Sequence, residues 1–226
     1  MYSYKILGLV LAFGMAGAGC ASNEKLIDRT LKEFSGMLAS TSSTPGGGSG
    51  AALNALEGAS FIAMVAGITA EKPDFADMEP ELRLIIGETE KLRSLFLRLI
   101  DEDSLAYERF VSAMASGAGA SELKAALRGC IIPPFELLDG SVQALRLARE
   151  LSSRYYLPTA SDVGIAALNL ETAARGAYLT VCINLKGDSF DADEKAEYRE
   201  KSLSLLAEAE EISKEIYDSV KIHVEN

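Results

Sequence analysis

Two long segments of this sequence are apolar around nearly the whole circumference of a helix, and they restrict the fold more than any other feature. Residues 49–69 and 162–185 consist largely of Ala, Leu, Ile, Val and Gly, with few charged side chains. A helix that is apolar on every side has to lie at the centre of a protein. The small side chains of residues 49–69 also allow neighbouring helices to pack closely. These two segments therefore predict a pair of central helices.

The other segments have the three-to-four-residue periodicity of amphipathic helices. The periodicity predicts helices over residues 26–38, 80–116, 123–151 and 193–220, and Pro133 and Pro134 should kink or break the third of them. No segment of useful length alternates polar and apolar residues. The sequence thus predicts one all-α domain over residues 23–226, a multi-helix bundle with no significant sheet, in which amphipathic helices wrap the two apolar central ones.

Composition removes several classes of function. The net charge is −11, whereas a protein that binds nucleic acid needs a basic face. His223, near the end of the chain, is the single histidine, which argues against a histidine triad or a histidine metal site. Cys20, Cys130 and Cys182 are far apart and suggest neither a disulfide framework nor a zinc site. We therefore expect no metal, and acid–base chemistry would fall to Asp, Glu, Lys, Tyr or Cys.

The first 22 residues are excluded from the predicted fold. The apolar run 6–18 is followed by a Gly-Cys-Ala-Ser sequence, which resembles a bacterial secretion signal that ends at a lipid-modified Cys20. The alternative is an extended start, in which translation begins at Met15 and most of the run is missing. The first reading predicts a lipid-anchored or exported protein, with membrane association only through Cys20. The second reading predicts a cytoplasmic protein.

A run of glycines precedes the first apolar segment. The residues are Thr44, Pro45, Gly46, Gly47, Gly48 and Ser49. Consecutive glycines lose much backbone entropy on folding, and they are useful where a ligand must approach the backbone. Ser49 is the expected N-cap, and the N–H groups that follow would attract an anion. We therefore predict a ligand-binding loop over residues 45–49, the alternative being a flexible turn between two helices.

Asp103 is the most unusual polar residue in the sequence. It lies four residues after Leu99 and four before Tyr107, on the apolar stripe of its predicted helix. A carboxylate buried there is costly unless it is paired, hydrogen-bonded or protonated. Burial would raise its pKa, as a general acid at neutral pH requires. Asp101 is a second candidate, on another face of the helix. The alternative for Asp103 is a buried ion pair or a cap on another helix.

Four more polar residues complete the candidate site. Lys72 lies at a helix end, where it would meet an anionic ligand, the last carbonyls or solvent. Asp162 lies in the first turn of its helix, where a negative charge is favourable. Arg175 follows Glu171 by four residues, so the two can pair. Asn184 has no structural explanation that the sequence reveals.

Three blocks resemble the cyclodeaminase/cyclohydrolase family. They are the glycine run 44–49, the Asp-Glu-Asp-Ser-Leu-Ala-Tyr sequence at 101–107, and the segment 161–185 with its Arg-Gly-Ala and Ile-Asn-Leu sequences. The resemblance covers about residues 25–220 and implies a domain of this type over residues 23–226. The family comprises formiminotetrahydrofolate cyclodeaminases and methenyltetrahydrofolate cyclohydrolases. It is all-helical and dimeric, and it binds folate in a cleft.

The resemblance implies chemistry on a tetrahydrofolate one-carbon unit, in the setting of histidine degradation. In the cyclodeaminase reaction, N10 of 5-formiminotetrahydrofolate attacks the formimino carbon and ammonia leaves, which gives 5,10-methenyltetrahydrofolate. In the alternative, cyclohydrolase reaction, water opens the methenyl ring to 10-formyltetrahydrofolate. A second alternative is a non-catalytic exported protein on the same fold. No bound cofactor and no nucleic-acid partner are expected, and the chain should be a homodimer that takes a tetrahydrofolate substrate.

The same resemblance assigns roles to the candidate residues. Asp103 would protonate the departing nitrogen, with Asp101 as the second catalytic candidate. The loop over residues 45–49 would contact the substrate through backbone N–H groups. Asp162, Arg175 and Asn184 would meet the pterin or aminobenzoate part, and the basic side chains that would hold a glutamate tail are reduced to Lys72.

Overall fold

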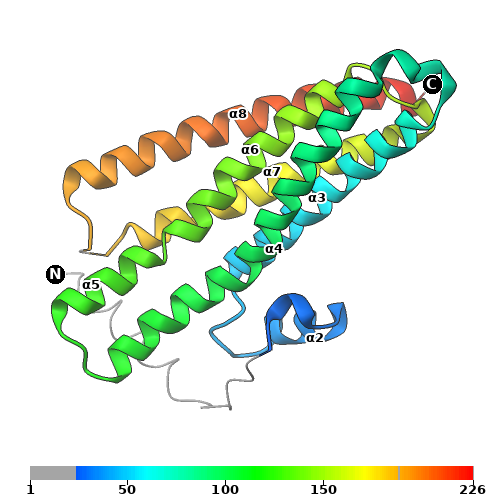
Figure 1. The fold of residues 1–226 in the computed structure, drawn as a ribbon. Helices are drawn as coiled ribbons and strands as arrows, with labels where there is room; N and C mark the ends of the chain where they lie inside the picture. Colours follow the sequence, from blue (N-terminus) through cyan, green and yellow to red (C-terminus); the bar gives the residue numbers. More distant parts are fainter. Residues whose placement is uncertain (1–23, 188, 226) are drawn as a thin grey trace.

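The computed structural model of the chain describes residues 24–187 and 189–225, which adopt the all-α fold that the sequence predicts (Figure 1). No strand occurs among these described residues. The elements, with short 3-10 helices marked η, are η1 (Leu26–Asp28), α2 (Leu31–Leu38), α3 (Gly47–Ala70), η2 (Pro73–Met78), α4 (Glu79–Ala115), α5 (Ala120–Gly129), α6 (Ile132–Ser152), η3 (Leu157–Thr159), α7 (Ala160–Asn184) and α8 (Ala192–Glu225). The signal-like segment 1–22, with Cys20, lies outside the described residues.

The two apolar segments become α3 and α7, which pack against each other at the centre of the bundle. Ala51 in the first half of α3 faces Gly176 in the second half of α7, and Gly58 faces Leu170, so the two helices are antiparallel. A Cβ atom on Gly58 would lie 2.7 Å from Leu170 Cγ, closer than packed atoms approach. The small residues therefore permit the close packing of the two helices, as the sequence predicts.

Three further helices, α4, α6 and α8, cover one side of this central pair (Figure 1). α6 packs against α3 and α7, while α4 and α8 lie on either side of it. Their inward faces supply the large side chains of the core, including Phe96, Leu138, Leu145 and Ile212, each with 0–1% of its surface exposed. Burying a side chain of this size stabilises the fold by roughly 1.5–3 kcal/mol.

The opposite side of the central pair is not covered within the described part of this chain. On α7, Leu179 and Ile183 are 67% and 58% exposed, and Ile165 and Leu168 are 41% and 42% exposed. Met64 of α3 is 40% exposed. We call these five residues the apolar face. By length and composition α3 is the one described helix that would be able to cross a membrane, but here it packs between α4 and α7.

The predicted single helix over residues 26–38 is wrong. The chain forms η1, turns, and starts again as α2, with Thr30 as the N-cap. The Thr30 side chain accepts from the Glu33 backbone N–H, and the Glu33 side chain accepts from the Thr30 backbone N–H. This capping box is readable in the sequence as Thr-x-x-Glu, and it overrides the helical periodicity. The predicted helix over 123–151 is broken just before Pro133, which begins α6 with its neighbours.

Candidate functional site

Asp103 of α4 lies against the first turn of α3. The two helices are antiparallel neighbours, so the middle of α4 reaches the start of α3. The Ser49 backbone N–H donates to Asp103 Oδ2 over 3.0 Å, and Ser49 Oγ lies 3.4 Å from the same oxygen. The glycine run and the carboxylate on the apolar stripe, which are 54 residues apart in sequence, therefore form one site.

Gly48 leaves the space that this carboxylate occupies. A Cβ atom at Gly48 would lie 2.0 Å from Asp103 Oδ1 and 2.3 Å from Asp103 Cγ, so any other residue would displace the carboxylate. Gly47, by contrast, is exposed, and a Cβ atom there would meet nothing within 4 Å. Pro45 is buried and Gly46 is partly exposed. The glycines thus have two separate functions: Gly48 admits the acid, and Gly47 faces open space.

The prediction that Ser49 is the N-cap of this helix is wrong. α3 begins at Gly47 with Gly46 as its N-cap, and no side chain caps it. The first N–H groups of a helix have no partners within the helix, and a cap normally supplies one. Here the Asp103 carboxylate, which comes from α4, accepts the Ser49 N–H instead. Ser49 is therefore free to turn its hydroxyl toward α4, where it donates to the Ile100 carbonyl over 2.8 Å.

Opposing effects act on the charge of Asp103. Burial raises the pKa of its carboxyl, and the hydrogen bonds from the Ser49 backbone and side chain lower the pKa by a smaller amount. The net result is a pKa above the ordinary value of 3.8. A raised pKa keeps more of the carboxyl in the protonated form near neutral pH, as proton donation requires.

The junction between α5 and α6 forms another wall of the site. The Cys130 thiol donates to the Ala106 carbonyl, one turn after Asp103, over 3.5 Å. Burial, together with the charge of Asp103, raises the pKa of this thiol to about 11, so it is neutral. The Asn184 amide donates to the Cys130 carbonyl over 2.7 Å, which brings the end of α7 to the same region. This bond supplies the structural explanation for Asn184 that the sequence lacks.

Asp101 has a different environment from Asp103. Its Oδ1 atom accepts the Leu26 backbone N–H over 2.7 Å, so this carboxylate fastens the N-terminal segment to α4. The structure therefore gives Asp101 a structural role and shows no contact between it and the glycine run. Its assignment as a second catalytic residue stays a prediction.

Lys72 and Asp162 are not brought to the Asp103 site within this chain. Lys72 follows the last turn of α3, with its Nζ atom 4.6 Å from the centre of the Tyr156 ring, and Asp162 lies in the first turn of α7. α3 separates this end of the bundle from Gly48 by about 30 Å. Arg175 forms ion pairs with Glu171 and Glu210, each at 2.8 Å. These three residues stay predictions as substrate contacts.

Ser104 belongs to the site, although the sequence analysis does not select it. It is 5% exposed, and its Oγ atom lies 3.0 Å from Ser49 Oγ. The available signal was its position: it lies four residues after Ile100, on the buried side of α4, directly after the unusual Asp103. A small polar residue there is easily taken for a tolerated core serine. Among the described residues, no group of three His, Cys, Asp or Glu side chains comes together as a metal ion would require.

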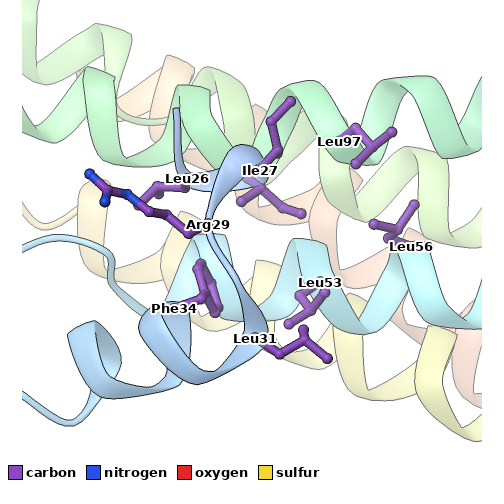
Figure 2. Close-up of a pocket in the computed structure, with 9 residues that line it drawn as sticks. Leu26, Ile27, Arg29, Leu31, Phe34, Leu53, Leu56 and Leu97 are labelled. Atoms are coloured by element: carbon purple, nitrogen blue, oxygen red, sulfur yellow. The ribbon is translucent and has the colours of Figure 1, made fainter. Parts of the chain in front are cut away.

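A separate apolar pocket of about 170 Å³ lies under the N-terminal segment (Figure 2). Neither Asp103 nor the glycine run contributes to its wall. Figure 2 shows side chains from η1 and α2 facing those of α3 and α4, with the Arg29 guanidinium directed away from them. The lining residues are Leu26, Ile27, Arg29, Leu31, Phe34, Leu53, Leu56, Leu97 and Ile100.

The fold and the site define a class of protein: an antiparallel helical bundle in which a partly buried carboxyl group lies on a glycine-lined helix start. Residues 30–204 match the family model described as formiminotransferase-cyclodeaminase. The chain therefore belongs to the formiminotransferase-cyclodeaminase family, in agreement with the resemblance that the sequence motifs indicate.

Individual relatives fall into two named activities. The methenyltetrahydrofolate cyclohydrolase of Methylorubrum extorquens is 31% identical over 87% of this chain and 98% of that protein. The formimidoyltransferase-cyclodeaminase of Sus scrofa is 31% identical over 82% of this chain, which spans 36% of the pig protein. The crystal structure of formiminotetrahydrofolate cyclodeaminase from Thermotoga maritima superposes with a TM-score of 0.74 at 27% identity, covering 87% of this chain and 96% of that one.

Proposed function

We propose that this chain is an enzyme of folate one-carbon metabolism, and that it cyclises 5-formiminotetrahydrofolate to 5,10-methenyltetrahydrofolate with release of ammonia. Membership of the family and the likeness to the Thermotoga maritima cyclodeaminase support the proposal. The observation that carries the mechanism is the position of Asp103 on the backbone of Gly48 and Ser49. It joins a proton donor to a helix start with exposed backbone at Gly47.

The chemistry needs a proton at one defined moment. N10 forms a bond to the formimino carbon, and the carbon becomes tetrahedral between N5 and N10. The proton of N10 moves to the imino nitrogen, which becomes an amino group on this carbon. The bond from the carbon to the amino nitrogen then breaks as that nitrogen receives one further proton and leaves as ammonia, and N5 and N10 share the positive charge of the methenyl product. The protonated Asp103 carboxyl is the proposed donor. Proton transfer from a positioned group typically contributes about 10²–10⁴ in rate.

The cyclohydrolase reaction is the second candidate, and one observation favours it. The Methylorubrum extorquens relative, which carries that name, aligns over 98% of its own length and 87% of this chain, whereas the chain spans 36% of the pig cyclodeaminase. In this reaction water adds to the methenyl carbon, a carbon–nitrogen bond breaks, and the ring opens to 10-formyltetrahydrofolate. The same tetrahedral carbon forms, so the same acid is able to serve both reactions.

One pair of assays distinguishes the two reactions. Purified protein is incubated with 5-formiminotetrahydrofolate and, separately, with 5,10-methenyltetrahydrofolate, and the methenyl absorbance is followed. We expect the absorbance to rise in the first assay faster than the background rate. A rise no faster than background removes the cyclodeaminase proposal, and a catalysed fall in the second assay identifies the cyclohydrolase. Background rates with both substrates would support the non-catalytic alternative, which the comparisons do not support.

We also propose that the chain is a homodimer, with the apolar face buried between two copies. The support is that Leu179, Ile183 and their neighbours on α7 are exposed although α7 is a central helix. Light scattering after gel filtration should give twice the chain mass. Leu179→Glu should convert the protein to a monomer, whereas Leu203→Glu, at a similarly exposed leucine on α8, should leave the mass unchanged. A monomeric native protein would refute this arrangement.

The location of the protein is a further proposal. We propose a cytoplasmic protein whose translation begins at Met15, because a folate enzyme acts where its substrate is kept. Mass spectrometry of the native N-terminus tests this directly. An acylated Cys20 would contradict it.

A further inference from the structure

Two buried hydroxyl groups lie beside Asp103 and form a chain of close contacts. Ser49 Oγ is 2.8 Å from the Ile100 carbonyl oxygen, 3.0 Å from Ser104 Oγ and 3.4 Å from Asp103 Oδ2. Ser49 has none of its surface exposed and Ser104 has 5%. Neither hydroxyl is therefore able to rely on solvent for its hydrogen bonds, so the two side chains must satisfy each other and their neighbours.

The number of protons on the two hydroxyls determines which group donates in each of these hydrogen bonds. A serine hydroxyl has a single proton to donate and two lone pairs that accept. The Ile100 carbonyl is only an acceptor, so the short contact from Ser49 uses the one Ser49 proton. Ser104 must then be the donor in the contact between the two hydroxyls. The order of donation is Ser104 to Ser49, and Ser49 to the Ile100 carbonyl, with Asp103 Oδ2 as its alternative acceptor.

We propose that Ser104 is a positioning residue that acts through Ser49: its donated hydrogen bond keeps the Ser49 proton directed at Ile100 and Asp103, never back at Ser104. This inference rests on the proposed function, in which Asp103 is the acid. While Asp103 is protonated, Ser49 donates to the Ile100 carbonyl. Once Asp103 has given up its proton, a small rotation of the Ser49 hydroxyl stabilises the carboxylate. The pair thus provides a hydrogen bond that strengthens as the acid ionises.

The other ionisable groups near Asp103 do not take over the hydrogen bonding that the Ser49 and Ser104 hydroxyls provide. The Cys130 thiol, from the junction of α5 and α6, is held neutral by its raised pKa. The positive charge of Arg109, on α4, lowers the pKa of the same thiol by a smaller amount. Glu102, next to Asp103, pairs with Arg98 over 2.6 Å. From α3 the contact to Asp103 comes from Ser49 and from the backbone at Gly48, neither of which titrates.

The test follows the protonation of Asp103 in the ligand-free protein by difference infrared spectroscopy, with Asp103→Asn to assign its carboxyl band. The variants are Ser49→Ala, Ser104→Ala and the double variant, and Ser141→Ala is the matched control. Ser141 is also fully buried, but its hydroxyl donates to the Leu137 carbonyl of its own helix. Thermal unfolding checks that each variant is folded, and the pH profile of kcat/KM is measured in parallel.

Loss of a hydrogen bond to a charged group should raise the Asp103 midpoint by roughly one pH unit in Ser49→Ala. Ser104→Ala should raise it by about half as much, because it removes only the support for the Ser49 bond. The double variant should match Ser49→Ala alone, because Ser104 acts through Ser49. The alkaline limb of kcat/KM should move by the same amounts, and Ser141→Ala should move neither midpoint.

Two results would overturn the inference: an unchanged midpoint in Ser104→Ala, or a Ser104→Ala shift that adds in full to that of Ser49→Ala. Failure of the proposed function is distinct, because it appears as absent activity in the unsubstituted protein. The infrared titration needs no substrate, so it decides the role of Ser104 even then.

Discussion

Asp101 and Asp103 are two residues apart on α4, and the segments that contact them differ. Each carboxylate accepts one backbone N–H from another segment, Asp101 from Leu26 and Asp103 from Ser49. The Leu26 donor belongs to a short N-terminal segment that lies on the surface of α3 and α4. The Ser49 donor belongs to a central helix, and the carboxylate that it meets is pressed onto the backbone of Gly48.

The difference shows that the sequence neighbours of a partly buried carboxylate do not determine its role. Asp101 holds a segment in place beside an apolar pocket. Asp103 lies partly buried against the first turn of α3, and this burial raises the pKa of its carboxyl. A single turn of α4 therefore contains a carboxylate that anchors a segment and a carboxyl with a raised pKa, and the neighbouring elements decide which is which. Four predictions test this contrast, from the largest expected effect to the smallest.

The largest effect should come from removing the proton of the acid. Asp103→Asn keeps the shape and an acceptor for the Ser49 N–H but does not donate a proton as an acid. We expect turnover to fall by about 10²–10⁴-fold with little change in substrate affinity, because the acid acts in the transition state. Steady-state assays measure both parameters. Asp101→Asn is the matched control, and an equal fall in that variant would remove the contrast between the two residues.

Gly48→Ala should have the next largest effect. The added methyl group would lie 2.0 Å from Asp103 Oδ1, so the carboxylate has to move by an ångström or more. We expect turnover to fall by about 10²-fold and stability to fall by about 1–3 kcal/mol. Gly47→Ala, with open space around its Cβ atom, should leave the free energy of unfolding within about 0.5 kcal/mol of the native value. Urea denaturation compares the two, and equal losses would show that Asp103 does not require Gly48.

Asp101→Ala should produce a modest loss of stability. It removes the acceptor of the Leu26 N–H and releases the segment that covers the apolar pocket. We expect the free energy of unfolding to fall by about 1 kcal/mol. Hydrogen exchange should show that the Leu26 amide loses protection. A protected amide in this variant would show that other contacts hold the segment.

The smallest effect concerns the pH dependence of stability. The pKa of Asp103 is raised in the folded chain, so its contribution is fully present below the unfolded value of 3.8 and is lost as the pH rises through the folded pKa. Asp103→Asn removes this loss. Its stability relative to the native protein should therefore increase from pH 3.5 to pH 7, measured by urea denaturation at each pH. A difference that stays constant with pH would show that burial does not hold the proton on Asp103.

The sequence predicts the fold well because its strongest signals are local. The apolar circumference of α3 and α7 and their small residues identify the central pair, and the helix period identifies the covering helices. Helix starts are less predictable. Ser49 is a residue type that commonly caps helices, but the acceptor at the start of α3 is the Asp103 carboxylate of α4, 54 residues away. A contact at that separation leaves no trace in the local pattern.

The candidate site is predicted in part for the same reason. Asp103 stands out because a carboxylate on an apolar stripe conflicts with its surroundings, and the glycine run stands out by composition. Ser104 does not stand out, because buried serines are common in helices. Its place in the site depends on a contact with the Ser49 hydroxyl that the local sequence does not show. Lys72 and Asp162 stay predictions, because the length of α3 separates both from Asp103 within one chain and the local sequence pattern carries no information on that distance.

The contact between Gly48 and Asp103 links the permitted substitutions at two distant positions. A chain that keeps the carboxyl has to keep glycine at position 48, whatever other changes the first helical turn accumulates. A descendant that loses the carboxyl is at once released to acquire a side chain there. Positions 48 and 103 should therefore vary together, and a residue other than glycine at position 48 should be accompanied by loss of the carboxyl at position 103.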